Sequence, residues 1–179
     1  RFPSALLGTA SILLVMVLGG LLYGQKVGAI AGMLAAVSLN LTHVSRVGLI
    51  ESTLIFFMLL AFVFFVKALS DERFFIPLGI TLGLALLTKY TAIVVAPIFL
   101  TVLLIHRRDL LLSRNLWIGF LIAFVMQTPV IIYNVKLFTS FGHFDYALMN
   151  MIGPLPEVWK INPGRDIGSI GERIKEYIP

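Results

Sequence analysis

The sequence predicts an all-α, polytopic membrane protein. Of its 179 residues, 59% are hydrophobic and only 13% are charged, and the mean hydropathy is +0.98, far outside the range of water-soluble domains. Several apolar runs approach the roughly 20 residues that an α-helix needs to cross a bilayer. The runs lack the alternating pattern of barrel strands, so a transmembrane helical bundle is the expected fold.

The apolar runs predict about six transmembrane helices. The stretch from Phe74 to Ile105 corresponds to about 48 Å of helix, which is too long for one span. We therefore split it into two short helices that meet at Lys89, in the polar sequence "TKYT". The six predicted helices, with approximate ends, are 4–23, 27–44, 49–66, 74–88, 91–105 and 116–133.

The sequence "HVSRVGLIES", from His43 to Ser52, separates two of these helices with charged residues. On one continuous helix Arg46 and Glu51 would point about 140° apart. Gly48 lies between them and predicts a tight turn at the membrane interface, which would let both side chains face a common pocket. The alternative is that they are ordinary interfacial charges at a helix end.

The distribution of cations predicts the sidedness of the bundle. By the positive-inside rule, the turns rich in Lys and Arg face the cytoplasm. Arg46 and Lys89 lie in the sparsely charged turns and are therefore expected on the extracytoplasmic side. The cations of the other turns are Lys26, Lys67, Arg73, Arg107, Arg108 and Arg114.

We expect two regions: a transmembrane bundle over residues 1–134 and a mostly irregular extracytoplasmic segment over 135–179. The second region is rich in Pro and Gly, and Ser169–Ile178 predicts a short amphipathic helix at the membrane surface. The net charge of +5 falls mostly in short loops, so it does not indicate nucleic-acid binding. Cysteine is absent, which excludes disulfides and thiolate metal sites.

Five side chains besides Arg46 could carry chemistry. Lys89 is costly at membrane depth, by up to about 2.5–3.5 kcal/mol near a helix centre, so either it snorkels to the surface or it binds an anion such as phosphate. His43 could be a ligand or an acid–base group, or a hydrogen-bonded interface residue. His143 and Asp145 in "GHFD" could bind a metal or an acceptor, or form a turn network. Glu51 could orient an acceptor or bind a divalent cation, and no other cofactor is expected.

The first 105 residues resemble a known enzyme family. The resembling features are "RFPSAL" before a helix, the "YG" turn at its end, "SR" followed by an acidic residue five positions after the arginine, and "GLALLTK". In this order they resemble the protein mannosyltransferase and aminoarabinose transferase type of membrane glycosyltransferase, family 39 of the GT-C fold. The resemblance continues more loosely through "TPVIIYN" and "GHFD".

The resemblance implies an integral protein of the cell membrane that transfers a sugar, at the extracytoplasmic face, from a polyprenyl-phosphate donor to a protein or lipid acceptor. It implies Glu51 and Arg46 as catalytic residues, and Lys89 with Arg46 as ligands of the lipid phosphate. It also places the general base in a loop upstream of Arg1, so we expect this chain to be a fragment that is inactive alone. Other partners are membrane lipids.

Two other functions remain open at this stage. A transporter or lipid flippase would carry charges near the bilayer midplane and unwound helices, and Pro97 lies inside a predicted helix. A non-catalytic membrane scaffold is the second possibility. The clustering of charges at helix ends on one side favours the glycosyltransferase.

Overall fold

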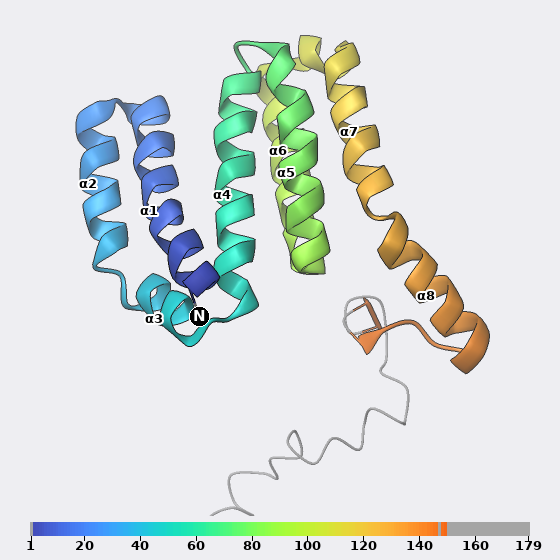
Figure 1. The fold of residues 1–179 in the computed structure, drawn as a ribbon. Helices are drawn as coiled ribbons and strands as arrows, with labels where there is room; N and C mark the ends of the chain where they lie inside the picture. The colour runs from blue at the N-terminus through green and yellow to red at the C-terminus, as the bar shows by residue number, and fades with distance from the viewer. Residues whose placement is uncertain (1, 147, 150–179) are drawn as a thin grey trace, which may run out of the picture. The chain divides into compact units, whose positions relative to one another are not determined.

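The computed structural model describes residues 2–146, 148 and 149, and in this part of the chain it is helical without strands (Figure 1). The all-α prediction is confirmed. The α-helices are α1 (Phe2–Tyr23), α2 (Gln25–Ala36), α3 (Leu39–Val47), α4 (Ile50–Ala68), α5 (Phe75–Thr88), α6 (Val95–His106), α7 (Arg114–Met126) and α8 (Thr128–Phe141). Three short 3₁₀ helices join them: η1 (Glu72–Phe74), η2 (Tyr90–Val94) and η3 (Arg108–Leu112).

The predicted helix breaks at Gly48 and Lys89 are both present. Two predicted helices differ. Residues 27–44 form α2 and α3, bent by 56° relative to each other, and residues 116–133 fall in α7 and α8, bent by 43°. The backbone of Ser38 is extended, with φ −66° and ψ 119°, and this ends the regular path of α2. Val37 and Ser38 are both compatible with a continuous helix, so the bend between α2 and α3 was not predicted.

The lengths of the helices limit how many can cross a membrane singly. α1, with 22 residues, and α4, with 19, are long and apolar enough. The number among the described residues rises to four if the bent pairs α2–α3 and α7–α8 each form one broken span. α5 and α6 have 14 and 12 residues, so neither alone reaches the length of a full span. The number of helices that meet the length of a span is therefore smaller than the six or so predicted from the sequence.

The chain forms two compact units, Arg1–Val130 and Ile131–Pro179. The first contains the bundle of α1–α7. The second contains most of α8, which continues to Phe141 and so extends into the region where we expect mostly irregular chain. Gly142 ends that helix with a left-handed φ of 73°. The predicted helix at Ser169–Ile178 lies outside the described residues.

Small residues let the helices of the first unit approach closely. At Gly79 of α5 an added Cβ would collide with the carbonyl oxygen of Gly119 in α7, and at Gly28 of α2 it would collide with that of Met16 in α1. Such contacts replace the hydrophobic driving force that helices lack within lipid. α2 therefore packs closely against α1 through its small residues.

An aromatic core joins α4 to α6. The rings of Phe65 and Phe99 stack with centroids 4.1 Å apart, and Phe62 meets Phe99 edge-on at 5.0 Å. Phe75, Leu78 and other buried residues surround these rings.

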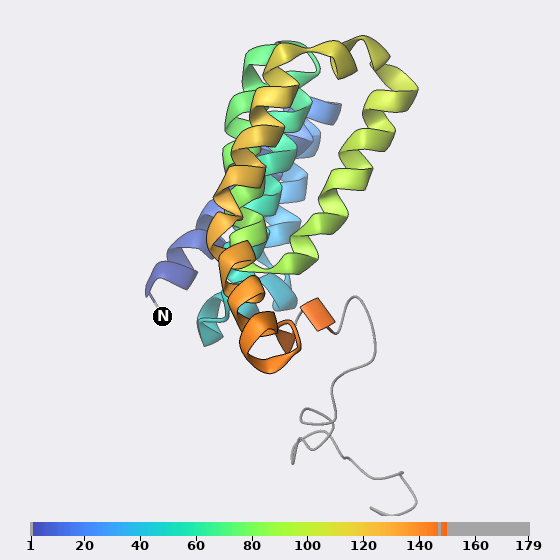
Figure 2. The ribbon, with the colours of Figure 1, turned by 90° about the vertical axis from the view of Figure 1, so that its right-hand side faces the viewer.

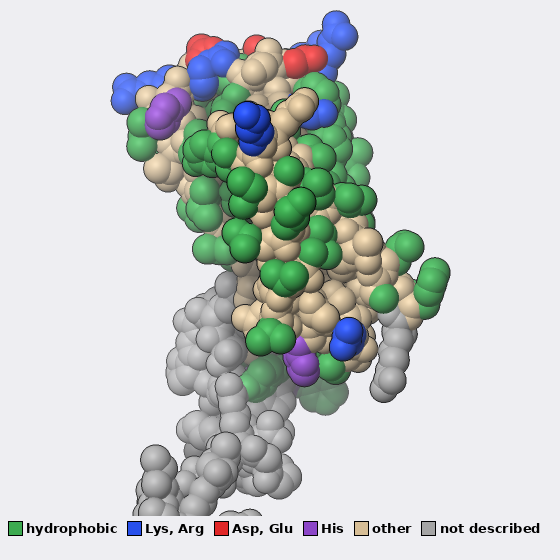
Figure 3. Space-filling view, turned by 90° about the vertical axis from the view of Figure 1, so that its left-hand side faces the viewer, with side chains coloured by type: hydrophobic (Ala, Val, Ile, Leu, Met, Phe, Trp, Pro, Cys, Tyr) green, Lys and Arg blue, Asp and Glu red, His purple; other side chains and the backbone are tan. Residues whose placement is uncertain are grey.

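The charged side chains of the bundle lie mainly at its two ends. One end contains the turn from α4 to α5 and the turn from α6 to α7, and we call it the basic end. Its charged residues are Lys67, Asp71, Glu72, Arg73, Arg107, Arg108, Asp109 and Arg114. Figure 3 shows Lys, Arg, Asp and Glu gathered there above a broad apolar flank. The opposite end, the Lys89 end, carries His43, Arg46, Glu51 and Lys89.

Candidate functional site

An ion pair at the Lys89 end joins two helix breaks that are far apart in the sequence. The Nζ atom of Lys89 donates a hydrogen bond to Oε1 of Glu51 over 3.0 Å. The two side chains are partly open to the surroundings, with 43% of Lys89 and 37% of Glu51 exposed. The pair is therefore held in place yet accessible to a ligand.

The first break is made by Gly48. Its φ of 81° is left-handed, which glycine adopts without steric cost, and its N–H donates to the carbonyl of Val44. α3 ends there and α4 begins at Ile50, so Glu51 lies in the first turn of α4. A carboxylate at that position interacts favourably with the helix dipole.

The second break is made at Lys89 itself. α5 ends at Thr88, and Lys89 is extended, with φ −160° and ψ 134°, before η2 begins. The N–H of Lys89 still bonds to Ala85, and its carbonyl accepts from Ala92. Both flanking helices are thus anchored while the lysine side chain leaves the helical path.

A small buried cluster packs the helix segments that carry Glu51 and Lys89 against each other. Leu54 of α4 packs with Ala85 of α5 and Ala92 of η2, and both alanines are fully buried. Ser52 is also buried, and its hydroxyl donates to the carbonyl of Leu49. These contacts fix the start of α4 against the end of α5, which explains how residues 38 positions apart meet.

Arg46 and His43 lie on α3 at the same end. Both side chains are exposed, and neither forms a hydrogen bond or ion pair with another described residue. Arg46 is in the last turn of α3, where a cation complements the helix dipole. The structure thus pairs Lys89 with Glu51, and it leaves the Arg46 guanidinium, among the described residues, available to an external anion.

His143 and Asp145 belong to the second unit, where Asp145 forms a turn network. Asn134 of α8 donates to Oδ2 of Asp145 over 3.0 Å and accepts from the Asp145 N–H over 2.9 Å. Oδ1 of Asp145 accepts the N–H of Leu148, and Nδ1 of His143 lies 2.9 Å from the carbonyl oxygen of Phe144. These contacts match the turn alternative, although they leave a role in acceptor binding a prediction. Sequence analysis missed Asn134, whose signal is a lone amide within an apolar helix.

The basic end differs in its chemistry, because Arg107, Asp109 and Glu72 bind neighbouring side chains and the backbone. Arg107 pairs with Asp109 at 2.8 Å and also donates to the carbonyl of Leu69. The hydroxyl of Ser113 donates to Glu72. The hydrogen bond from Arg107 holds the pKa of Asp109 below its usual value. These bonds hold the turn after α4 against the turn after α6.

Comparison with known proteins decides the family. The family model described as dolichyl-phosphate-mannose-protein mannosyltransferase matches residues 1–133. The chain belongs to this mannosyltransferase family. No curated protein and no solved structure gives a significant match.

The matched range contains the whole Lys89 end. Residues His43, Arg46, Glu51 and Lys89 all lie within the part of the chain that resembles the mannosyltransferases, while His143 and Asp145 lie beyond it. Membership of the family and the apolar helices together indicate an integral membrane glycosyltransferase. The resemblance noted in the sequence is therefore confirmed at the level of the family.

Proposed function

We propose that the protein transfers a sugar from a polyprenyl-phosphate donor to a hydroxyl group of a protein or lipid, at the extracytoplasmic face of the cell membrane. The observation that carries this proposal is the accessible Glu51–Lys89 pair at the sparsely charged end of the bundle. A polyprenyl phosphate presents its anion at the membrane interface, where an ammonium group can bind it. Family membership supports the same donor chemistry.

Lys89 and Arg46 are suited to stabilise the leaving group. In the reaction the acceptor oxygen forms a bond to the anomeric carbon, and the bond between that carbon and the phosphate oxygen breaks. The electron pair of the broken bond goes to the polyprenyl phosphate, whose negative charge increases. Fixed cations beside that oxygen lower the energy of the transition state, and this kind of electrostatic term is often the largest in catalysis.

Glu51 has two consecutive roles in this proposal. In the absence of donor it holds the Lys89 ammonium, at an N–O distance of 3.0 Å. When the donor phosphate replaces it as the partner of Lys89, the carboxylate is released and can orient the acceptor hydroxyl. We assign acceptor contacts to His43, which lies on α3 with Arg46. The acceptor proton passes to the general base, which is the separate acidic residue implied by the family resemblance and not Glu51.

The described residues do not form a metal centre at this end. No group of three or more His, Cys, Asp or Glu side chains in the described part of the chain could hold an ion. Glu51 is a single carboxylate already paired with a lysine. Binding of a divalent cation by Glu51 stays a prediction.

The test is to follow both halves of a labelled donor. Membranes containing the complete protein are incubated with polyprenyl-phosphate mannose that carries one label in the sugar and another in the lipid. We expect the sugar label to move to protein or lipid hydroxyl groups and the lipid label to remain as polyprenyl phosphate. A nucleotide-linked mannose serves as the comparison donor and should give no direct transfer.

Two results would contradict the proposal. Direct transfer from the nucleotide sugar in membranes free of polyprenyl phosphate would exclude the lipid donor. Movement of both labels together between the leaflets, with the glycosidic bond intact, would indicate a lipid flippase. The bend between α2 and α3 is the feature that favours this second function.

A further inference from the structure

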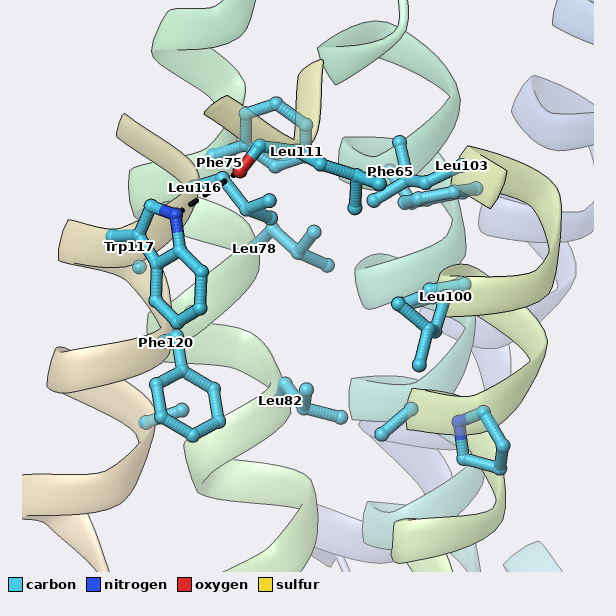
Figure 4. A pocket seen from close by; sticks show the side chains of 16 residues that line it. Phe65, Phe75, Leu78, Leu82, Leu100, Leu103, Leu111, Leu116, Trp117 and Phe120 are labelled. Carbon is cyan, nitrogen blue, oxygen red and sulfur yellow. Dashed lines mark hydrogen bonds between the residues drawn. The ribbon is translucent and has the colours of Figure 1, made fainter. Parts of the chain in front are cut away.

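A cavity of about 700 Å³ lies within the first unit, between α6 on one side and α5 and α7 on the other. Its wall is apolar, and Figure 4 shows the side chains that line it. They include Leu78 and Leu82 of α5, Leu100 and Leu103 of α6, and Leu116 and Phe120 of α7. This volume is in the usual range of ligand pockets.

The packing of the surrounding helices explains why the space exists. α5 and α7 touch through Gly79 and Gly119, whereas α6 stands apart from them (Figure 2) and is tied to α4 by the stacking of Phe99 on Phe65. An apolar cavity gives water no hydrogen-bond partners, so it does not hold ordered water. In a bilayer, hydrocarbon chains are the apolar material at hand.

Two arginines lie on the same helix faces as residues of the cavity wall. Arg108 precedes Leu111 by three positions in η3, and side chains at that spacing eclipse in a 3₁₀ helix. Arg114 precedes Trp117 by three positions in α7, which also places them on one face. The Trp117 indole N–H donates to the carbonyl of Leu111 over 3.0 Å and so closes the rim between them.

Both arginines are available to an external anion. They are exposed, and neither forms an ion pair within the described residues, in contrast to the neighbouring Arg107, which is neutralised by Asp109. The Nε of Arg108 donates to the carbonyl of Leu104, which holds the guanidinium in place at the end of α6. An apolar cavity with two exposed cations on the helix faces that line it fits an anionic amphiphile.

We propose that this cavity binds an acyl chain of an anionic glycerophospholipid, whose phosphate is held by Arg108 and Arg114. The phosphate position at Arg108 and Arg114 is separate from the Lys89 end, although the cavity wall extends to Ala96 and Pro97 in the first turn of α6. α5 begins beside the rim at Phe75 and ends next to Lys89, and its 14 residues span about 21 Å. The positive-inside rule assigns the basic end to the cytoplasmic side, where the leaflet is rich in anionic lipids.

Trp117 provides the test, because it lines the cavity and its fluorescence is quenched by bromine on nearby acyl chains. The sequence contains two tryptophans, so the protein is prepared with Trp159→Phe, which leaves Trp117 as the single tryptophan of the sequence. It is reconstituted in bilayers of phosphatidylcholine and phosphatidylglycerol, with bromine on one lipid at a time. We expect brominated phosphatidylglycerol to quench Trp117 far more than brominated phosphatidylcholine at equal mole fraction.

Three variants distinguish the contribution of the lipid headgroup to binding from that of the acyl chain. Arg108→Gln with Arg114→Gln should reduce the preference for phosphatidylglycerol by about fivefold or more, since each cation near the headgroups favours an anionic lipid by about fivefold. Ala96→Phe places a ring in the cavity and should also abolish the preference. Lys26→Gln removes a cation from another turn of the same predicted side and should change nothing.

The proposal is overturned by equal quenching from the two lipids, or by a preference for phosphatidylglycerol that the double arginine variant leaves undiminished. A preference that survives Ala96→Phe would place the headgroup on the surface without the cavity, and it too overturns the proposal. Recovery of fluorescence on addition of polyprenyl phosphate would assign the cavity to the donor instead. The double arginine variant leaves the interior unchanged, so the test holds even if Ala96→Phe fails to insert.

Discussion

The two ends of the bundle of α1–α7 use charged residues in different ways. At the basic end, Arg107 binds Asp109 and a backbone carbonyl, and Ser113 binds Glu72, so two adjacent turns are joined by several bonds. At the Lys89 end, one exposed ion pair joins the start of α4 to the end of α5. Arg46, on α3 at the same end, forms no ion pair with a described residue.

This difference distinguishes charges that complete a turn from charges that can bind a ligand. The Arg107–Asp109 pair spans two positions in the sequence and is formed by a single turn, whereas the Glu51–Lys89 pair spans 38 positions and depends on the packing of two helices. Exposed pairs contribute little to stability. The position of an exposed ion pair at the meeting point of two helix breaks is therefore better explained by ligand binding than by a contribution to the stability of the fold.

Lys89→Ala should give the largest effect. Loss of the ammonium removes a preorganised cation from the leaving phosphate, and we expect sugar transfer to fall by about 100-fold. Transfer from labelled polyprenyl-phosphate mannose in membranes measures this. The control is Lys67→Ala at the basic end, where the lysine lies over the ring of Phe74, and transfer should stay near wild type. Equal loss in both variants would remove the functional distinction between the two ends.

Arg46→Ala should reduce transfer less, by about tenfold, because its guanidinium assists a phosphate already held by Lys89. Arg46→Lys should recover part of the activity, since it keeps the charge but loses the planar pair of donors. Arg73→Ala at the basic end is the matched control. Full activity of Arg46→Ala would leave Lys89 as the cation on which the proposed site depends.

Gly48→Ala tests whether the turn positions the Lys89 end. A Cβ at φ 81° costs about 1 kcal/mol, which lowers the thermal midpoint of the protein in detergent by about 2–4 °C. Transfer should fall together with the midpoint, because Arg46 and Glu51 flank this turn. Gly20→Ala is the control, since an added Cβ there meets nothing within 4 Å. A similar loss in both variants would show a general effect of losing glycine.

Asp109→Asn should give the smallest effect, limited to the stability of the basic end. Because the hydrogen bond from Arg107 lowers the pKa of Asp109 in the folded protein below its ordinary value of 3.8, the stabilisation is fully present above that pH and is lost as the pH falls through the lowered pKa. The thermal midpoint of the wild type should therefore exceed that of the variant at neutral pH, and the two should converge in strong acid. A difference in midpoint independent of pH would exclude the ion pair as its cause.

Much of this architecture could be predicted from the sequence because it depends on local composition. Long apolar runs determine helices, Gly48 determines a left-handed turn, and the polar residues at Lys89 determine a break, each through the chemistry of a few adjacent residues. The bend between α2 and α3 was not predictable in this way, since Val37 and Ser38 are compatible with a continuous helix. The extension of α8 to Phe141 was missed because Pro and Gly further along the chain dominated the prediction.

The sequence by itself determined that this is a helical membrane protein with cations concentrated on one side, and it identified Glu51 and Lys89 separately as candidates. Only the tertiary structure decided that these two residues bind each other, because their contact depends on the packing of Leu54 against Ala85 and Ala92. The cavity beside Trp117 also arises only in three dimensions. Its cause is the close approach of α5 and α7 at two glycines, which leaves α6 at a distance, and no pattern along a single helix encodes the space between three of them.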